Sequence, residues 1–322
     1  MSESLAYSMM RVFVNWQRER RLNKVRERKQ AARMANGLLA AGGLSIVDGG
    51  QSLALRVDGS IACWGDNTFG QAPPAGVPGN FVAIAAGELH SLAIRVDGSV
   101  ACWGDNGFGR APPDGVPGNF VAIAAGPAHS LALRVDGSVA CWGNNFAGQA
   151  PPAGVPGNFV AIAAGGGHSL ALRVDGSIAC WGNNFAGQAP PAGVPGNFVA
   201  IATGTAHSLA LRVDGSISCW GYNENDQAPP AGVPGNFVAI AADARHSLAL
   251  RVDGSVACWG DNENDQAPPA GVPGDFVAIA AGLRHSLALR VDGSIACWGR
   301  NGHGQAPPAG VSGPFRVTQA NL

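Results

Sequence analysis

Residues 159–197, FVAIAAGGGHSLALRVDGSIACWGNNFAGQAPPAGVPGN, form one copy of a unit that the chain repeats seven times. The repeat is marked by seven tryptophans, each 39 residues after the last: Trp64, Trp103, Trp142, Trp181, Trp220, Trp259 and Trp298. Six histidines from His90 to His285 keep the same period, with Gln51 in the first histidine position. A fixed period of about 20–50 residues indicates supersecondary units that bury their apolar surfaces against one another.

Each unit contains three short apolar runs, FVAIAAG, HSLALRV and S(V/I)(A/S)CWG. Val-Asp-Gly-Ser joins the second run to the third, and Asp-Gly favours a hairpin because a type I′ turn needs positive φ at both central residues. Gly-x-x-His, between the first and second runs, is also of turn length. The segment that follows the third run cannot continue a strand, because its prolines lack an amide donor. The unit is therefore predicted to be a three-stranded antiparallel meander followed by a Pro/Gly-rich crossover.

The arrangement of these units follows from the need to bury both apolar faces of each sheet. A lone three-stranded sheet is marginally stable, and strands that are apolar on both faces must be covered on both. Seven sheets arranged radially cover one another and keep their edges short. An open solenoid would need atypical polar caps at its ends, and the outermost units here look ordinary. We therefore predict an all-β fold, a seven-bladed β-propeller of three-stranded antiparallel blades, preceded by a basic N-terminal α-helix.

The predicted domains are a basic helical extension at residues 1–41 and the propeller at residues 42–322. The extension contains nine Lys/Arg and three Glu, whereas the remainder contains 12 Lys/Arg and 19 Asp/Glu. The extension lacks proline, is rich in helix formers, and carries a stripe of apolar residues that includes Leu5, Met9 and Trp16.

The role of residues 1–41 stays open among several hypotheses. The composition fits a solvated helix or a disordered tail, and the stripe fits docking into a partner or a larger assembly. The arginines suggest a mitochondrial-type presequence, but the three glutamates argue against it. Clustered arginine without a recognised fold is weak evidence for binding nucleic acid or an anionic membrane, so we do not expect a nucleic acid partner. No stretch approaches the roughly 20 apolar residues of a transmembrane segment.

The ends of the repeat region predict how the ring closes. Residues 42–50, GGLSIVDGG, stand where FVAIAAGxx should be in the first unit, and Phe315 falls one period after Phe276. A propeller closes when one terminus completes a blade that the other began. We favour Phe315–Gln319 as the closing strand over Leu44–Val47, because the former keeps the phenylalanine.

The pairing of Ala-Gly-x-x-His-Ser-Leu-Ala-Leu with Asp-Gly-x-x-x-x-Trp-Gly-x-Asn-x-x-Gly-Gln, as in residues 162–188, resembles the regulator of chromosome condensation repeat. The 39-residue unit is similar to the short form of the repeat found in the second β-lactamase inhibitor protein. The resemblance implies a seven-bladed propeller that binds other proteins with one end of the disc. The exchange factor of the family also has a projecting wedge, and no unit here contains an evident insertion that would supply one.

Two places vary between otherwise near-identical units: the pair of residues before each histidine, and the residues after Trp-Gly-x-Asn. In a meander, both places lie at the same edge, opposite the Asp-Gly hairpin, so both are expected to open on one face of the disc. Exposed aromatics and arginines beside a polar rim are typical of binding hot spots. There are two alternatives. The variation could be neutral sequence drift in loops that tolerate substitution, or the phenylalanines could simply cover the end of the propeller. The candidate protein-binding residues are Phe69, Phe108, Phe146, Phe185, Arg245, Arg284, Glu224, Glu263 and His303.

The titratable residues predict no chemistry of their own. Seven cysteines, one per unit from Cys63 to Cys297, would lie too far apart to form disulfides, and no CxxC suggests zinc. Buried free thiols fit a reducing, intracellular compartment, cytoplasmic or organellar such as mitochondrial. A histidine repeated in every unit is expected to be structural rather than a metal ligand.

Catalysis requires a unique convergence of side chains, which seven near-identical units do not offer. We therefore expect no enzymatic activity, no cofactor and no metal. The predicted function is a non-catalytic scaffold that binds a protein partner through the variable loops, with residues 1–41 as tether or assembly contact. The alternative is a regulator of a small GTPase or an enzyme inhibitor that uses the same face.

Overall fold

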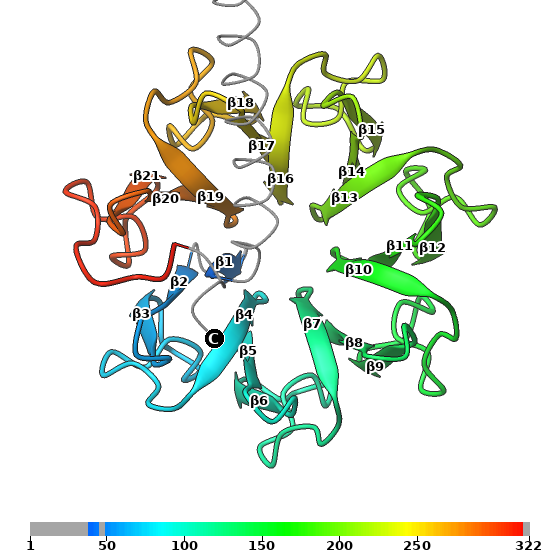
Figure 1. The fold of residues 1–322 in the computed structure, drawn as a ribbon, viewed down its shortest axis with the longest axis horizontal. Coiled ribbons are helices and arrows are strands. Elements are labelled where there is room, and N and C mark those ends of the chain that lie inside the picture. Colours follow the sequence, from blue (N-terminus) through cyan, green and yellow to red (C-terminus); the bar gives the residue numbers. More distant parts are fainter. Residues whose placement is uncertain (1–37, 45–48, 318–322) are drawn as a thin grey trace, which may run out of the picture.

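The computed structural model describes residues 38–44 and 49–317, and their regular structure consists of 21 strands in seven three-stranded antiparallel sheets. The sheets surround a central axis as the blades of a β-propeller (Figure 1). Each consecutive trio of strands makes one blade, from blade 1 (β1–β3) to blade 7 (β19–β21). The innermost strands of neighbouring blades contact one another around the whole ring, including β19 with β1. The predicted closed ring of seven blades is therefore confirmed.

The three strand positions of a blade recur with nearly constant bounds. The innermost strands are β1 (Leu39–Leu44), β4 (Phe81–Ala86), β7 (Phe120–Ala125), β10 (Phe159–Ala164), β13 (Phe198–Thr203), β16 (Phe237–Asp243) and β19 (Phe276–Ala281). The middle strands are β2 (Gly49–Leu55), β5 (His90–Arg95), β8 (His129–Arg134), β11 (His168–Arg173), β14 (His207–Arg212), β17 (His246–Arg251) and β20 (His285–Arg290). The outer strands are β3 (Ile61–Gly65), β6 (Val100–Gly104), β9 (Val139–Gly143), β12 (Ile178–Gly182), β15 (Ile217–Gly221), β18 (Val256–Gly260) and β21 (Ile295–Gly299).

The hydrophobic core lies between the blades rather than within one of them. On β8, Leu131 and Leu133 are fully buried and pack with Phe159 and Ala171 of blade 4. Ala132, between the two leucines, belongs instead to the cluster shared with blade 2. Successive side chains of a strand point to opposite faces of the sheet, so the Leu-Ala-Leu run presents two large side chains to one neighbour and a small one to the other. This alternation lets near-identical blades fit together around the ring.

A belt of hydrogen bonds also joins the blades. In six blades the histidine Nε2 lies 2.8–3.0 Å from the serine Oγ of the next blade, as between His129 and Ser169. Each of those serine hydroxyls already donates its hydrogen to a backbone carbonyl, as Ser169 does to Gln149. The histidine must therefore be the donor, which fixes the proton on Nε2. The seventh link is made by Gln51, whose Nε2 donates to Ser91 Oγ.

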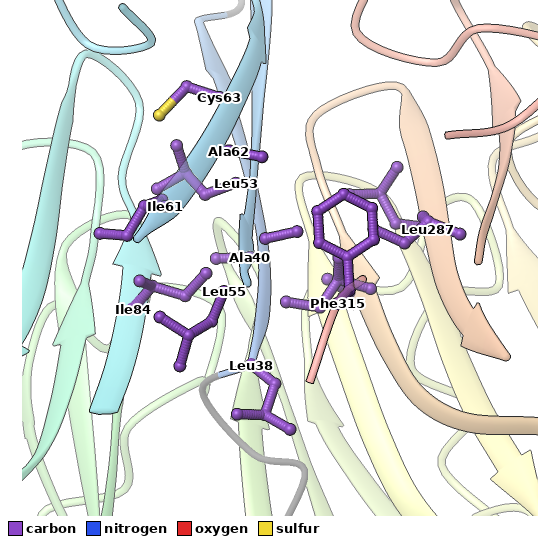
Figure 2. Close-up of a cluster of buried hydrophobic side chains, with 14 of the residues drawn as sticks. Leu38, Ala40, Leu53, Leu55, Ile61, Ala62, Cys63, Ile84, Leu287 and Phe315 are labelled. Atoms are coloured by element: carbon purple, nitrogen blue, oxygen red, sulfur yellow. The ribbon is translucent and has the colours of Figure 1, made fainter. Parts of the chain in front are cut away.

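The closing strand differs from the prediction. β1 pairs with β2 over Leu39–Leu44, so the N-terminal part of the chain supplies the innermost strand of blade 1. Phe315 only forms an isolated bridge to Arg56. That bridge matches the Phe81–Arg95 pair of blade 2, so Phe315 fills the phenylalanine position of blade 1. Figure 2 shows Leu38 and Phe315, from the first and last described parts of the propeller, in one apolar cluster, where Leu38 is 1% and Phe315 is 5% exposed.

The predicted domain boundary is corrected for the same reason. Leu39, Ala40 and Ala41 were placed in the helical extension, but they are strand residues of the propeller. The remainder of the predicted helix, residues 1–37, lies outside the described residues. In the portion of the chain that the structure describes, no helix is long and apolar enough to cross a membrane.

The expectation that no unit contains an insertion is also wrong. Leu39 pairs with Ala54 as Ile84 pairs with Ala93, so Gly42 of blade 1 corresponds to Gly87 of blade 2. Gly87 precedes its histidine by three residues, whereas Gly42 precedes Gln51 by nine. Blade 1 therefore contains six additional residues between Gly42 and Gln51. Because of them, the Leu-Ala-Ala-Gly of blade 1 does not lie at the expected 39-residue spacing from the repeats that follow.

Candidate protein-interaction face

The two sets of variable loops lie at the same end of the disc, which we call the variable face. In every blade the backbone amide after Trp-Gly donates to the carbonyl of the residue before the histidine position, as from Asp105 to Leu89 (2.8 Å) and from Arg300 to Arg284 (2.8 Å). The Asp-Gly turns lie at the opposite end, which we call the hairpin face. The predicted gathering of both variable sites on one face is thus what the structure shows.

Blades 1–4 contribute an aromatic half to the variable face. Phe69, Phe108, Phe146 and Phe185 are 46%, 49%, 90% and 100% exposed. Phe108 and Phe146 come from neighbouring blades and meet edge to face, with ring centroids 6.2 Å apart. Large apolar side chains that are exposed in adjacent loops form the kind of patch that marks interaction sites on soluble proteins. Phe146 and Phe185 in particular are therefore presented to solvent, whereas Phe69 and Phe108 are about half covered.

Arg110 supports this aromatic half and was missed in the sequence. It stands in the position that glutamine occupies in the other six units and is only 5% exposed. Its guanidinium donates to Pro127 O (2.8 Å), forms an ion pair with Asp105, and lies 5.7 Å from the centre of the Phe108 ring. Arginine over an aromatic face is a favourable cation–π contact, so Arg110 fixes Phe108 beside Phe146. The signal that could have revealed it is the single break in the Gln-Ala-Pro pattern, where Arg110 replaces the glutamine.

Blades 5 and 6 contribute an acidic half. Their loops carry Glu224 with Asp226 and Glu263 with Asp265. Asp226 and Asp265 have φ of 59° and 61°, where five other blades have glycine. Aspartate in the left-handed region is uncommon and less favourable than glycine. These two loops therefore keep their carboxylates at some cost to local stability.

The remaining candidates border the acidic half. Arg245 is exposed and Arg284 is half-buried. Arg245 precedes the histidine of blade 6, and its carbonyl accepts from Asp261 N at the start of the acidic loop (2.9 Å). His303 is exposed in the corresponding loop of blade 7, where its amide donates to Gln305 Oε1 (2.8 Å). All nine candidate residues thus lie on the variable face, in an aromatic and a charged half.

The centre of the variable face is narrow because glycines ring it. A Cβ added to Gly165 would lie 2.3 Å from Cε1 of His168 and 2.7 Å from Gly204 O, so the belt histidine leaves room only for glycine. Blade 6 has Asp243 in this position, followed by Ala244 with φ of 34°. Burial raises the pKa of Asp243 to about 7, and Glu88 on the opposite side of the axis adds to the rise.

The histidines and cysteines have the surroundings of structural residues. Burial lowers the pKa of the six belt histidines to about 3–4, so they are neutral at pH 7. Burial raises the pKa of the cysteine thiols to about 11–12, and all seven are free. Among the described residues, no three His, Cys, Asp or Glu side chains are grouped so that they could hold a metal ion.

A closed ring of near-identical three-stranded blades, with most sequence variation in loops on one face, defines the chain as a repeat β-propeller. Six segments match the regulator of chromosome condensation (RCC1) repeat: residues 81–110, 120–149, 159–188, 198–227, 237–266 and 276–305. The chain belongs to this repeat family. Each match begins at the phenylalanine of an innermost strand, which blade 1 lacks within its own unit.

Solved structures share the fold. The CRINKLY WD40 ectodomain of the receptor kinase ACR4 from Arabidopsis thaliana is similar with a TM-score of 0.67 and 23% identity, over 84% of this chain and 98% of that one. Prp20p from Saccharomyces cerevisiae, described with its binding to Gsp1p and histones, is similar with a TM-score of 0.65 and 23% identity, over 78% and 81%. Yeast RCC1 (Prp20) bound to Kap60 gives a TM-score of 0.61 and 24% identity, over 74% and 75%. No curated protein matches the chain in sequence.

Proposed function

We propose that the chain is a non-catalytic interaction scaffold whose variable face binds a protein partner. The observation that carries the proposal is the exposure of four phenylalanines on that face, two of them at 90% and 100%. Exposed aromatics bury large apolar areas on binding and dominate interface energetics. The structural relative Prp20p, the yeast RCC1, is described with binding to Gsp1p and histones and in a complex with Kap60, which agrees with an interaction role for this fold.

The aromatic and acidic halves together indicate the chemistry of the partner. The aromatic half would hold an apolar anchor, and Glu224 and Glu263 beside it favour basic groups at the rim. A partner surface with apolar side chains next to lysine or arginine meets both requirements. Electrostatic complementarity of this kind speeds association and selects against acidic partners.

The test is affinity capture with the full chain as bait, compared with the double variant Phe146→Ser/Phe185→Ser. Loss of two exposed anchors is expected to weaken a specific partner by at least about tenfold, since hot-spot residues contribute about 1–2 kcal/mol or more each. The control is Val135→Ser/Val174→Ser on the hairpin face, where both valines are also well exposed, at 70% and 72%. Equal recovery with both double variants would remove the basis of the proposal.

Regulation of a small GTPase is the second candidate function. It is favoured by the likeness to Prp20p, described by its binding to Gsp1p, and by the six additional residues that the sequence of blade 1 has between Gly42 and Gln51. Measurement of nucleotide release from purified small GTPases tests it. Release that stays at the intrinsic rate would leave the scaffold function alone.

A further inference from the structure

We propose that the variable face of one copy binds residues 1–37 of a second copy, so that the propellers associate head to tail. This inference rests on the proposed function and names a partner for the same face. It is carried by the distribution of charge over the two faces, by the pattern of residues 1–37, and by the point at which the chain enters the disc.

The charge of the propeller is concentrated on the variable face. Nine described carboxylates belong to its loops: Asp66, Glu88, Asp105, Glu224, Asp226, Asp243, Asp261, Glu263 and Asp265. Four arginines accompany them, Arg110, Arg245, Arg284 and Arg300, which leaves a formal net charge of −5.

The hairpin face is close to neutral. Seven Arg-Val-Asp-Gly turns supply seven arginines and seven aspartates, and Arg316 and Asp275 add one charge of each sign. Asp114, in the crossover that follows blade 2, is the one described charge outside both groups and adds −1. A cationic segment is therefore attracted to the variable face and not to the hairpin face.

Residues 1–37 have the complementary chemistry. They contain nine Lys/Arg and three Glu, a net charge of +6. Their apolar residues are concentrated before residue 17, including Met9, Phe13 and Trp16, and seven of the nine cationic residues follow between Arg18 and Lys29. The variable face has the same division, because the aromatic loop of blade 4, with Phe185, is next to the acidic loop of blade 5, with Glu224 (Figure 1). One segment can thus place its aromatic part on the phenylalanines and its arginines on the carboxylates.

The point at which the chain enters the propeller favours binding of residues 1–37 to a second copy over binding to their own variable face. Leu39 pairs with Ala54, and Leu38 O accepts from Leu55 N, so β1 starts at the hairpin face and runs toward the variable face. The segment before Leu38 therefore joins the propeller at the end of the disc opposite the face that attracts it. A propeller stacked on this end would present its variable face directly to the segment. Such a contact joins two different surfaces, so it can be repeated from copy to copy.

The test uses two variants of the full chain and sedimentation velocity. The face variant, Phe146→Ser/Phe185→Ser, keeps its N-terminal segment, and the segment variant, Phe13→Ser/Trp16→Ser, keeps its variable face. We expect the unaltered chain to associate with increasing concentration and each variant alone to stay monomeric. An equimolar mixture of the two variants should form a 1:1 dimer, because only one productive contact is available between them.

A second measurement identifies the contact. A labelled peptide of residues 1–37 is titrated onto the segment variant. The same titration on a chain that combines the substitutions of both variants should give an affinity at least about tenfold weaker. Binding should also weaken as ionic strength rises from about 0.1 M to about 0.5 M, since the charges lie at the surface. Val135→Ser/Val174→Ser, added to the segment variant, should leave the affinity unchanged.

A mixture of variants that stays monomeric, or an unaltered chain that is monomeric with its segment bound to its own face, would overturn the inference. The proposed function would still hold after that result if the Phe146→Ser/Phe185→Ser variant no longer captures a partner that the unaltered chain captures. The proposed function fails instead when that variant retains every captured partner, whatever the association state of the chain.

Discussion

The histidine belt makes the stability of the propeller depend on pH between 7 and 5. Each belt histidine is buried and neutral, with a pKa of about 3–4 in the folded protein against about 6.5 in the unfolded chain. The unfolded state therefore binds more protons in this range, and stability falls as the pH falls below about 6.5. Protonation would also add a hydrogen to Nδ1, which has no hydrogen-bond partner in His90, His129, His168, His207 and His246.

The size of the effect follows from the shift in pKa. At pH 5 an unfolded histidine of pKa about 6.5 is almost fully protonated while the folded one is not, which costs about 2 kcal/mol relative to pH 7. Six such residues give a loss on the order of 10 kcal/mol, comparable to the whole stability of a typical domain, about 5–15 kcal/mol. We therefore expect the propeller to unfold in mild acid, near pH 5.

The chain supplies its own matched substitution, because Gln51 makes the same blade-to-blade hydrogen bond without a titratable group. His129→Gln should reduce the loss of unfolding free energy between pH 7 and pH 5 by about 2 kcal/mol. Gln51→His should increase the loss by a similar amount.

The assay is urea unfolding at pH 7, 6 and 5, followed by tryptophan fluorescence and far-ultraviolet circular dichroism, since the tryptophan Nε1–H donates to the preceding blade. If His129→Gln lost as much stability on acidification as the unaltered protein, the belt could not be the origin of the acid sensitivity. A stability that stayed level down to pH 4 would contradict the reasoning for all six histidines.

Three further predictions concern single positions. Asp243→Gly should stabilise the protein, because it restores the glycine of the other blades. In urea titrations the gain should grow from pH 4 to pH 7, because over this range the aspartate is ionised in the unfolded chain but stays protonated in the folded one, and it should level off above pH 7. Phe315→Ala should cost about 3–5 kcal/mol by leaving a cavity where the termini meet, and a loss below about 1 kcal/mol would mean that blade 1 closes without it. Cys141 and its equivalents should react with a thiol reagent at pH 8 only after urea is added, because burial raises the pKa of the Cys141 thiol to about 12; rapid labelling of the folded protein would contradict this.

The sequence by itself determined the blade and the number of blades. The Asp-Gly turns, the prolines and the alternating Leu-Ala-Leu run act over a few residues, and the period of 39 repeats their effect seven times. The placement of both variable loops on one face also followed from the sequence, because a meander with turns of fixed length allows only one arrangement of its edges.

The tertiary structure alone decided how the ring closes and which residues are exposed. Leu39-Ala40-Ala41-Gly42 of blade 1 is equivalent to Ile84-Ala85-Ala86-Gly87 of blade 2. In blade 1 a longer connection separates this segment from Gln51. Pairing of the two strands across that connection depends on contacts with the neighbouring blades. The proton on Nε2 of the belt histidines, the buried Arg110 beneath Phe108 and the full exposure of Phe185 likewise depend on groups from adjacent blades. These properties arise between units, and a pattern that repeats within each unit carries no information about them.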